Sequence, residues 1–345
     1  MEKMSMKVDQ KKTIPSNILV HGAGSWGTAL AIQLARVGHK VFLYSWEQPH
    51  NVKMVASDRN YDYFPDIPFP NSLKAVLDWR TVIDSCSDVL IAAPSMGFTG
   101  TLLQLKSCLK NQGIIVATKG FCNERNELVH QVVEEITPRR NFGVIIGPSF
   151  AREVATGMPT SVLAASTSVD YASHIQQTFD SKFFRCYTST DVIGAEVGGA
   201  IKNVLAVACG ISEGLGFGTN AQSSIITRGL AELKRLGVHL GGRPETFSGL
   251  SGLGDVVLTC SDNQSRNRQF GVLLGKGKTE SEATKIVKQV VEGIPATKSA
   301  AELSQKSKII MPIVEMVYNI IYNNHTVRPA FEKLLTRRVT LEEQP

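Results

Sequence analysis

The first half of the chain alternates between short apolar runs and longer stretches of helical periodicity. The apolar runs cover residues 17–21, 40–45, 89–93, 114–118 and 142–146, and two further runs that favour strands cover 161–165 and 183–187. Apolar strands separated by helices indicate a mostly parallel sheet with helices on both faces. Ligands bind such sheets beyond the carboxyl ends of the strands, so the residues that follow each run are candidates for a binding site.

The second half is helical. From Val192 onward the strand pattern disappears, and the helical pattern is interrupted only by glycine-rich breaks. The 345 residues exceed one ordinary domain and suit two, each with its own core. We predict an α/β protein with a sheet-containing domain over residues 16–190 and an all-α domain over residues 191–345. Residues 1–15 are polar, lack an apolar signal core and are predicted to form a flexible tail.

A glycine motif, Gly-Ala-Gly-Ser-Trp-Gly at residues 22–27, follows the first apolar run and precedes a helical pattern from Thr28 to Val37. Between a strand and a helix, this motif is typical of a dinucleotide site. Gly22 permits the tight turn, Gly24 admits a pyrophosphate to the backbone, and Gly27 lets helix and strand pack closely. Glu47 follows about twenty residues later, where an acidic side chain binds a free ribose diol and repels a 2′-phosphate. This favours NAD, but the register is open by a residue or two, so NADP remains an alternative.

Lys202 occupies an unusual place, because it and Asn203 are the only polar residues in the apolar stretch 197–209. A helix that is apolar all round is normally buried, and burying an ammonium without a partner costs on the order of several kcal/mol. Lys202 therefore needs a structural ion pair, a route to the surface or a role in a catalytic site. Helical side chains lean toward the helix N-terminus, so Lys202 projects over a strip of small residues at 194, 198 and 199. That strip leaves room for a small molecule or for a second helix.

Asp255 and Thr259 lie four residues apart and so share one helical face. Asp255 is surrounded by apolar residues, and we interpret it as the N-cap of the helix after Gly254, as the counter-ion of Lys202, or as both. If the two side chains meet, burial and a second lysine lower the pKa of Lys202 while Asp255 raises it. The sequence leaves open which effect is larger.

Two further polar positions are candidates for binding an anion. The segment 262–268, Asp-Asn-Gln-Ser-Arg-Asn-Arg, contains capping residues and precedes a helical run. A helix N-terminus offers backbone donors to an anion, and an arginine adds a bidentate grip on phosphate; the alternative is an ordinary solvated helix start. Lys119 follows the run 114–118, at the carboxyl end of a predicted strand, as either a surface or a site residue.

Composition excludes several classes of protein. The formal charge of +6 is modest and no basic stripe alternates with aromatic residues, so we expect a small anionic metabolite as the partner and no nucleic acid. Six scattered cysteines without a Cys-X-X-Cys pair or a histidine cluster indicate a reducing cytoplasm and no metal site. No uninterrupted apolar run approaches the roughly 20 residues of a membrane span, so we expect no stable membrane insertion.

Six motifs in order make the chain resemble the NAD(P)-dependent glycerol-3-phosphate dehydrogenases of bacterial type, from about residue 17 to about residue 325. They are the glycine motif at 22–27, Ala-Thr-Lys-Gly at 117–120, Gly-Pro-Ser-Phe-Ala at 147–151, Gly-Gly-Ala-Ile-Lys-Asn-Val at 198–204, Gly-Leu-Gly-Asp at 252–255 and Ser-Arg-Asn-Arg at 265–268. The resemblance implies a Rossmann-type dinucleotide-binding domain followed by a helical substrate domain. It implies reversible reduction of dihydroxyacetone phosphate by NADH or NADPH to sn-glycerol 3-phosphate, a precursor of phospholipids. We expect a homodimer in the cytoplasm.

The resemblance also implies site residues. Lys202 would be the general acid for reduction and the proton acceptor in reverse, with Lys119 and Asp255 as its catalytic companions. The implied substrate site comprises Lys119, Gly147, Ser149, Lys202, Asn203, Asp255, Thr259, Ser265, Arg266 and Asn267. The implied cofactor site comprises Gly22, Gly24, Ser25, Trp26, Gly27, Trp46, Glu47, Lys119, Ala151, Arg266, Val291 and Glu292. Trp46 stands where the family often has a histidine or an arginine, so the resemblance leaves the choice between NAD and NADP open.

Two other functions remain as alternatives. One is another β-hydroxyacid-type dehydrogenase with a Rossmann domain and a helical domain, whose substrates carry a carboxylate. The other is a catalytically inactive dinucleotide sensor or nucleic-acid-binding module that keeps the fold. The paired lysines with Asp255 and Arg266 argue against a sensor, because a sensor needs no acid beside a nicotinamide.

Overall fold

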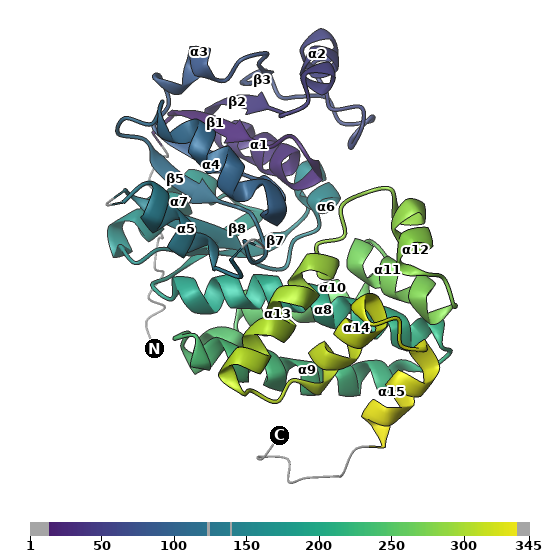
Figure 1. Ribbon diagram of the computed structural model, residues 1–345. Helices are drawn as coiled ribbons and strands as arrows, with labels where there is room; N and C mark the ends of the chain where they lie inside the picture. Colours follow the sequence, from purple (N-terminus) through teal and green to yellow (C-terminus); the bar gives the residue numbers. More distant parts are fainter. Residues whose placement is uncertain (1–13, 123–124, 139, 337–345) are drawn as a thin grey trace, which may run out of the picture.

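The computed structural model describes residues 14–122, 125–138 and 140–336 (Figure 1). The predicted tail at residues 1–15 therefore lies outside the described residues except for its last two. The described chain forms a sheet flanked by helices, followed by a part that contains only helices, and this confirms the predicted fold class.

One eight-stranded sheet, in the order β3-β2-β1-β4-β5-β6-β7-β8, forms the centre of the first half. All neighbours pair in parallel except β6 and β7, which are antiparallel. All seven predicted strands are present. The short β3, with an exposed lysine in its middle, was missed because three residues carry no readable period. The strands are β1 (Asn17–His21), β2 (Lys40–Tyr44), β3 (Leu73–Ala75), β4 (Asp88–Ile91), β5 (Gly113–Val116), β6 (Phe142–Ile146), β7 (Thr160–Ala165) and β8 (Phe184–Ser189).

Helices cover both faces of the sheet, which is why its central strands are mostly apolar. One buried cluster joins the sheet to α1 (Ser25–Val37), α6 (Ala151–Thr156) and α7 (Val169–Phe179). Another joins it to α3 (Arg80–Ile83), α4 (Phe98–Lys106) and α5 (Val129–Ile136). Helix α2 (Gln48–Ser57) lies beside β3 at the sheet edge (Figure 1). Helix α1 begins three residues before the predicted Thr28, because Gly24 serves as its N-cap.

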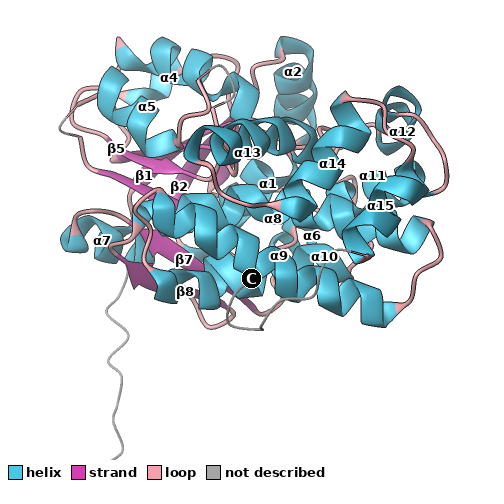
Figure 2. Cartoon of the chain, turned by 60° about the horizontal axis from the view of Figure 1, so that its bottom comes forward, coloured by secondary structure: helices cyan, strands magenta, loops and turns pink. Residues whose placement is uncertain are grey.

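The second half is built around α8 (Val192–Gly214), which contacts most of the helices that follow it. Figure 2 shows the strands on one side and this group of helices on the other. The other helices are α9 (Thr219–His239), η2 (Pro244–Ser248), η3 (Leu250–Gly254), α10 (Asp255–Ser261), α11 (Arg266–Gly275), α12 (Glu280–Val287), α13 (Gly293–Ser307), α14 (Pro312–Tyr322) and α15 (Val327–Leu335).

Helices α8 and α11 pack backbone against backbone. A Cβ built at Gly210 would lie 2.1 Å from the Arg268 carbonyl oxygen, and one built at Gly271 would lie 2.2 Å from the Val207 carbonyl oxygen. Only glycine permits this approach. It fixes the start of α11 close to the middle of α8, where Lys202 lies.

The length and apolar composition of α8 would by themselves suit a membrane span. The sequence predicted no span, because polar residues interrupt this stretch. However, 94% of its most apolar stretch is buried inside the protein. Helix α8 is therefore the core helix of the helical half, as an all-apolar pattern predicts.

Candidate active site

A cleft of about 970 Å³ lies between the carboxyl ends of the strands and the helical half. It is lined by the glycine motif, the ends of β2, β4 and β5, and residues of α8, α10 and α11. Ligand pockets span roughly 300–1,000 Å³, so the cleft is large enough for a dinucleotide and a small substrate together. The sheet places it where parallel α/β sheets bind ligands.

One buried carboxylate holds two lysines beside this cleft. The Lys202 Nζ atom donates to Asp255 Oδ1 at 2.5 Å and to Thr259 Oγ1 at 2.9 Å. The Lys119 Nζ atom donates to Asp255 Oδ2 at 3.1 Å and to the Gly147 carbonyl at 3.0 Å. The predicted ion pair of Lys202 with Asp255 is therefore present. The N-cap interpretation of Asp255 is wrong: Gly254 occupies the N-cap position, and the described contacts of the Asp255 carboxylate are with lysine and threonine side chains.

The structure also answers which effect on Lys202 is larger. Burial is the main cause, and together with the neighbouring Lys119 it outweighs the opposing effect of Asp255, so the pKa of Lys202 falls to about 8. A group that titrates near neutral pH is suited to general acid and base catalysis.

The glycine strip next to Lys202 is filled by protein. A Cβ built at Gly198 would lie 2.2 Å from the Ser251 carbonyl oxygen, and one built at Gly194 would lie 2.2 Å from Asp191 Oδ2. The interpretation of the strip as space for a small molecule is wrong. The backbone at Ser251 packs against Gly198 instead, a close approach of the kind expected in the alternative interpretation. Lys202 itself lines the cleft, so a substrate would meet the end of its side chain and not the glycines of its helix.

The start of α11, predicted to bind an anion, lies at the cleft. Ser265 caps the helix by accepting a hydrogen bond from the Arg268 N–H at 3.3 Å. Arg266 lines the cleft, and burial lowers its pKa. Asn267 Nδ2 donates to Asn203 Oδ1 at 2.8 Å, which ties the helix start to α8. The start of α11 thus lies on the same side of the cleft as Lys202.

Arg268 of the same motif has a different place. Its guanidinium contacts Asn263 and Glu213 and is not among the residues that line the cleft. The sequence alone does not tell which of Arg266 and Arg268 faces the cleft, because that depends on how α11 packs against α8.

Glu292 reaches across the cleft to the sheet. Its carboxylate accepts hydrogen bonds from the Ser95 N–H at 3.2 Å and from the Ser95 hydroxyl at 2.5 Å. Burial raises the pKa of Glu292, against the effects of Ser95 and Arg266. Sequence reasoning missed Ser95, although its position directly after a strand and Pro94 was a usable signal.

The glycine motif fits a dinucleotide. Gly22 has φ +121°, and a Cβ there would meet the Ala92 carbonyl oxygen at 2.6 Å. A Cβ at Gly27 would lie 1.9 Å from the Gly22 carbonyl oxygen, whereas a Cβ at Gly24 has no heavy atom within 4 Å. No side chain caps the start of α1, so its first N–H groups are available to an anion. The Trp26 indole N–H is buried, has no partner among the described residues and lies at the same cleft.

The structure gathers most of the predicted site residues around this one cleft. Those that line it are Gly22, Gly24, Ser25, Trp26, Gly27, Trp46, Glu47, Lys119, Ser149, Ala151, Lys202, Asn203, Thr259, Ser265, Arg266, Asn267 and Glu292. Gly147, Asp255 and Val291 are not lining residues; the first two contact the lysines from behind, and Val291 is buried. Sequence reasoning missed His21 and Tyr63, which also line the cleft.

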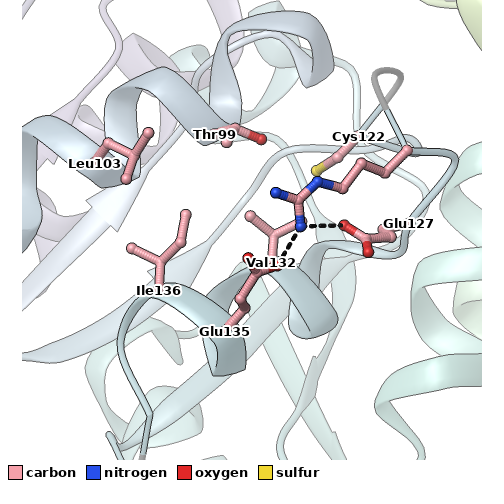
Figure 3. A pocket seen from close by; sticks show the side chains of 8 residues that line it. Thr99, Leu103, Cys122, Glu127, Val132, Glu135 and Ile136 are labelled. Atoms are coloured by element: carbon pink, nitrogen blue, oxygen red, sulfur yellow. Dashed lines mark hydrogen bonds and ion pairs between the residues drawn. The ribbon is translucent and has the colours of Figure 1, made fainter.

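A second cavity, of about 100 Å³, lies between α4 and α5 (Figure 3). Thr99 and Leu103 face Val132 and Ile136 across it, and Arg125 pairs with Glu127 and Glu135 at its margin. Its volume falls below the usual range for ligand pockets, so the large cleft is the candidate active site.

Comparison with known proteins agrees with this geometry. Two models of the NAD-dependent glycerol-3-phosphate dehydrogenases match the chain, the N-terminal one over residues 17–172 and the C-terminal one over residues 191–332. A glycerol-3-phosphate dehydrogenase (NAD(P)+) of Francisella tularensis subsp. tularensis is 50% identical over 328 residues, which cover 94% of this chain and 99% of that protein. The chain belongs to the NAD-dependent glycerol-3-phosphate dehydrogenase family. As a member, it is an NAD(P)-dependent oxidoreductase.

Solved structures of the family are similar over the same length. The glycerol-3-phosphate dehydrogenase of Coxiella burnetii has a TM-score of 0.91 and 42% identity, covering 94% of this chain and 99% of that one. The enzyme of Saccharomyces cerevisiae has a TM-score of 0.78 and 25% identity, covering 92% and 99%. A D-mandelate dehydrogenase, with 13% identity and a TM-score of 0.60, shares the fold alone. Family membership therefore favours the glycerol-3-phosphate dehydrogenases over other hydroxyacid dehydrogenases.

Proposed function

We propose that this chain catalyses the reversible reduction of dihydroxyacetone phosphate to sn-glycerol 3-phosphate with NADH or NADPH, with Lys202 as the general acid. The observation that carries the proposal is the buried Lys202 ammonium, held by Asp255 and Thr259 at the border of the cleft. The bound cofactor supplies the hydride. Negative charge then grows on the carbonyl oxygen of the substrate, and the Lys202 Nζ atom stabilises that charge and donates its proton.

Asp255 positions both lysines and keeps Lys202 charged. Because its two oxygens each bind one ammonium, the carboxylate holds the two lysines side by side and opposes the loss of the proton from Lys202. A pKa of about 8 for Lys202 means that the group is mostly protonated at pH 7 for reduction. It also means that Lys202 can accept a proton from the alcohol at mildly alkaline pH in the reverse direction.

Arg266 and the start of α11 would bind the substrate phosphate, with Ser265, Asn267 and Asn203 as neighbours. Binding a phosphate remote from the reacting carbon orients the ketone, which converts affinity into reaction geometry. Lys119, Gly147 and Ser149 would border the same substrate from the sheet side.

The proposed cofactor residues are those of the glycine motif, Ala151, Trp46, Glu47, Val291 and Glu292, with Lys119 and Arg266 at the junction with the substrate. The pyrophosphate would lie at the start of α1 and the adenosine at the end of β2. Trp46 is 74% exposed there, beside the exposed Glu47. An acidic group at this position favours a free ribose diol, which supports NADH; comparing kcat/KM for NADH and NADPH tests the preference.

Substrate choice separates this proposal from the alternatives. We expect NADH oxidation with dihydroxyacetone phosphate and little with 2-keto or 3-keto acids; activity with the acids alone would support the hydroxyacid dehydrogenase. Lys202→Ala is expected to reduce turnover by about 10²–10⁴ or more while cofactor binding changes little. Near-normal turnover of this variant would reject Lys202 as the acid. An unsubstituted protein with no turnover on any of these substrates would instead favour a sensor.

We further propose that the protein is a cytoplasmic homodimer that supplies glycerophospholipid synthesis. The boundary between the two proposed domains, 16–190 and 191–345, is supported by the end of β8 at Ser189 and the start of α8 at Val192. Light scattering after size-exclusion chromatography would test the dimer, since a monomer would elute with half the expected mass.

A further inference from the structure

Three buried polar side chains lie close to the glycine motif, in a segment that no sequence motif explains, and one of them, His50, also lines the cleft. His50, Asn51 and Asn60 have exposed fractions of 7%, 0% and 0%. Buried polar groups are stable only when they are hydrogen-bonded. The partners of these three side chains therefore show what the segment holds together.

Asn60 holds the glycine motif. Its Nδ2 atom donates to the Ala23 carbonyl at 2.9 Å and to Thr28 Oγ1 at 2.9 Å. The Thr28 hydroxyl in turn donates to the same carbonyl at 3.3 Å. Ala23 lies between Gly22 and Gly24, so one side-chain amide fixes the carbonyl in the middle of the loop. The N–H groups at the start of α1 directly follow this loop.

His50 continues the connection to the end of β2. Its Nε2 atom lies 2.9 Å from Asn60 Oδ1, and its Nδ1 atom lies 3.1 Å from Ser45 Oγ. Because Asn60 uses its nitrogen as a donor, its oxygen must accept, and the imidazole proton is thereby assigned to Nε2. Nδ1 then accepts from the Ser45 hydroxyl, and Ser45 Oγ accepts from the Glu47 N–H at 3.3 Å.

These hydrogen bonds form one continuous network in which each group donates to the next. It runs from the Glu47 N–H through Ser45, His50 and Asn60 to the Ala23 carbonyl. Every donor has an acceptor. The two ends of this network lie in two separate segments of the proposed cofactor site, the glycine loop and the turn after β2. Asp62 Oδ2 lies 3.9 Å from His50 Nε2, and the Asp62 side chain is half exposed.

We propose that Asn60 and His50 are positioning residues for the dinucleotide, which hold the glycine loop and the β2 turn in a fixed relation before the cofactor binds. The inference rests on the proposed use of a dinucleotide. A cofactor that spans both segments binds more tightly when they are already ordered, because less conformational freedom is lost on binding. Neither residue contacts the reacting atoms, so the chemical step is not affected.

The decisive variant is Asn60→Asp, which keeps the shape but replaces the Nδ2 donor by a carboxylate oxygen that faces the Ala23 carbonyl. Gln33→Glu is the matched control. Gln33 also lies on the first half of the protein in a buried position, and its Nε2 atom donates to a carbonyl, that of Phe179, and to a hydroxyl, that of Ser181. The control therefore suffers the same loss of donors, on the helix that the glycine loop begins, without touching the loop.

We expect Asn60→Asp to raise the Kd of NADH, measured by its fluorescence on the full-length protein, by roughly 5- to 20-fold relative to Gln33→Glu. The kcat at saturating NADH and the KM of dihydroxyacetone phosphate should stay within about twofold of the unsubstituted enzyme. Affinity for adenosine, which lacks the phosphates and would reach only the β2 turn, should fall less than affinity for NADH. A merely structural role would not separate these quantities.

His50→Gln provides a second variant if Asn60→Asp does not fold. Its amide still reaches Asn60 but not Ser45, so we expect a smaller increase in the Kd of NADH in the same direction. Equal NADH affinities in the position 60, position 50 and control variants would overturn the positioning role while leaving the proposed function intact. Failure of the unsubstituted protein to bind either NADH or NADPH would overturn both.

Discussion

Replacing Asp255 by asparagine tests the electrostatics of the site directly. The substitution keeps the shape of the side chain but removes the charge that binds Lys202 at 2.5 Å and Lys119 at 3.1 Å. Burial and Lys119 lower the pKa of Lys202, and Asp255 is the main group that raises it. Without the carboxylate, the pKa of Lys202 falls below about 8, and the loss of reductase activity on raising the pH moves to lower pH.

The size of the effect follows from the pKa of about 8. At pH 7 about nine tenths of Lys202 is then protonated. An opposite charge at this distance shifts a pKa by about 1–3 units, so the protonated fraction in Asp255→Asn falls to between about one half and one hundredth. From protonation alone, reduction of dihydroxyacetone phosphate at pH 7 should therefore slow by roughly 2- to 100-fold.

The assay is kcat for reduction, followed by NADH absorbance between pH 5.5 and 9. Activity of Asp255→Asn should recover toward low pH, where Lys202 regains its proton. Asp191→Asn is a control for lost stability, because Asp191 is a buried carboxylate that caps the far end of α8 through the Gly194 N–H at 2.9 Å. A pH profile of Asp255→Asn that keeps the shape of the unsubstituted profile would refute the assignment of Lys202 as the acid tuned by Asp255.

Two further substitutions test other parts of the structure. Arg266→Ala is expected to raise the KM of dihydroxyacetone phosphate by roughly 10- to 100-fold, because a hydrogen bond to a charged group contributes about 1.5–3 kcal/mol; steady-state kinetics with an unchanged KM would exclude Arg266 from phosphate binding. Gly198→Ala is expected to lower the free energy of unfolding by about 1–3 kcal/mol, because its Cβ would meet the Ser251 backbone. The loss should be larger than for Gly199→Ala, whose Cβ would meet the movable Ile146 side chain at 3.2 Å. Urea unfolding measures both, and equal losses would contradict the packing described for α8.

Much of the fold could be predicted because it depends on local patterns. Strands β1, β2, β4, β5 and β6 appear as largely apolar runs, because a sheet covered on both faces favours apolar residues on both sides of its central strands. Strand β3 escaped because its three residues, with the exposed Lys74 in the middle, give too short a pattern. The antiparallel direction of β7 also has no local signal, because a strand carries the same side chains in either direction.

The candidate site was predicted less completely. Lys202 and Asp255 could be matched because each was a charge among apolar residues and so required a partner. His50 and Asn60 carry no such signal, and Ser95 is marked only by its position after a strand and Pro94. They are ordinary polar residues in loops or short helices, and their roles depend on neighbours as far away in sequence as Glu292.

The sequence by itself determined the order of strands and helices along the chain and the glycine loop before α1, because each depends on residues close together in the sequence. It also determined that Lys202 needs a counter-charge, because a buried charge requires a partner wherever it lies. For two features that the sequence left open, the strip beside Lys202 and the pKa of Lys202, the tertiary structure decided the outcome. It filled the strip at Gly198 with the Ser251 backbone, and it made the desolvation of Lys202 stronger than its attraction to Asp255. Desolvation and close contact depend on distances between segments that are far apart in the chain, and only packing sets those distances.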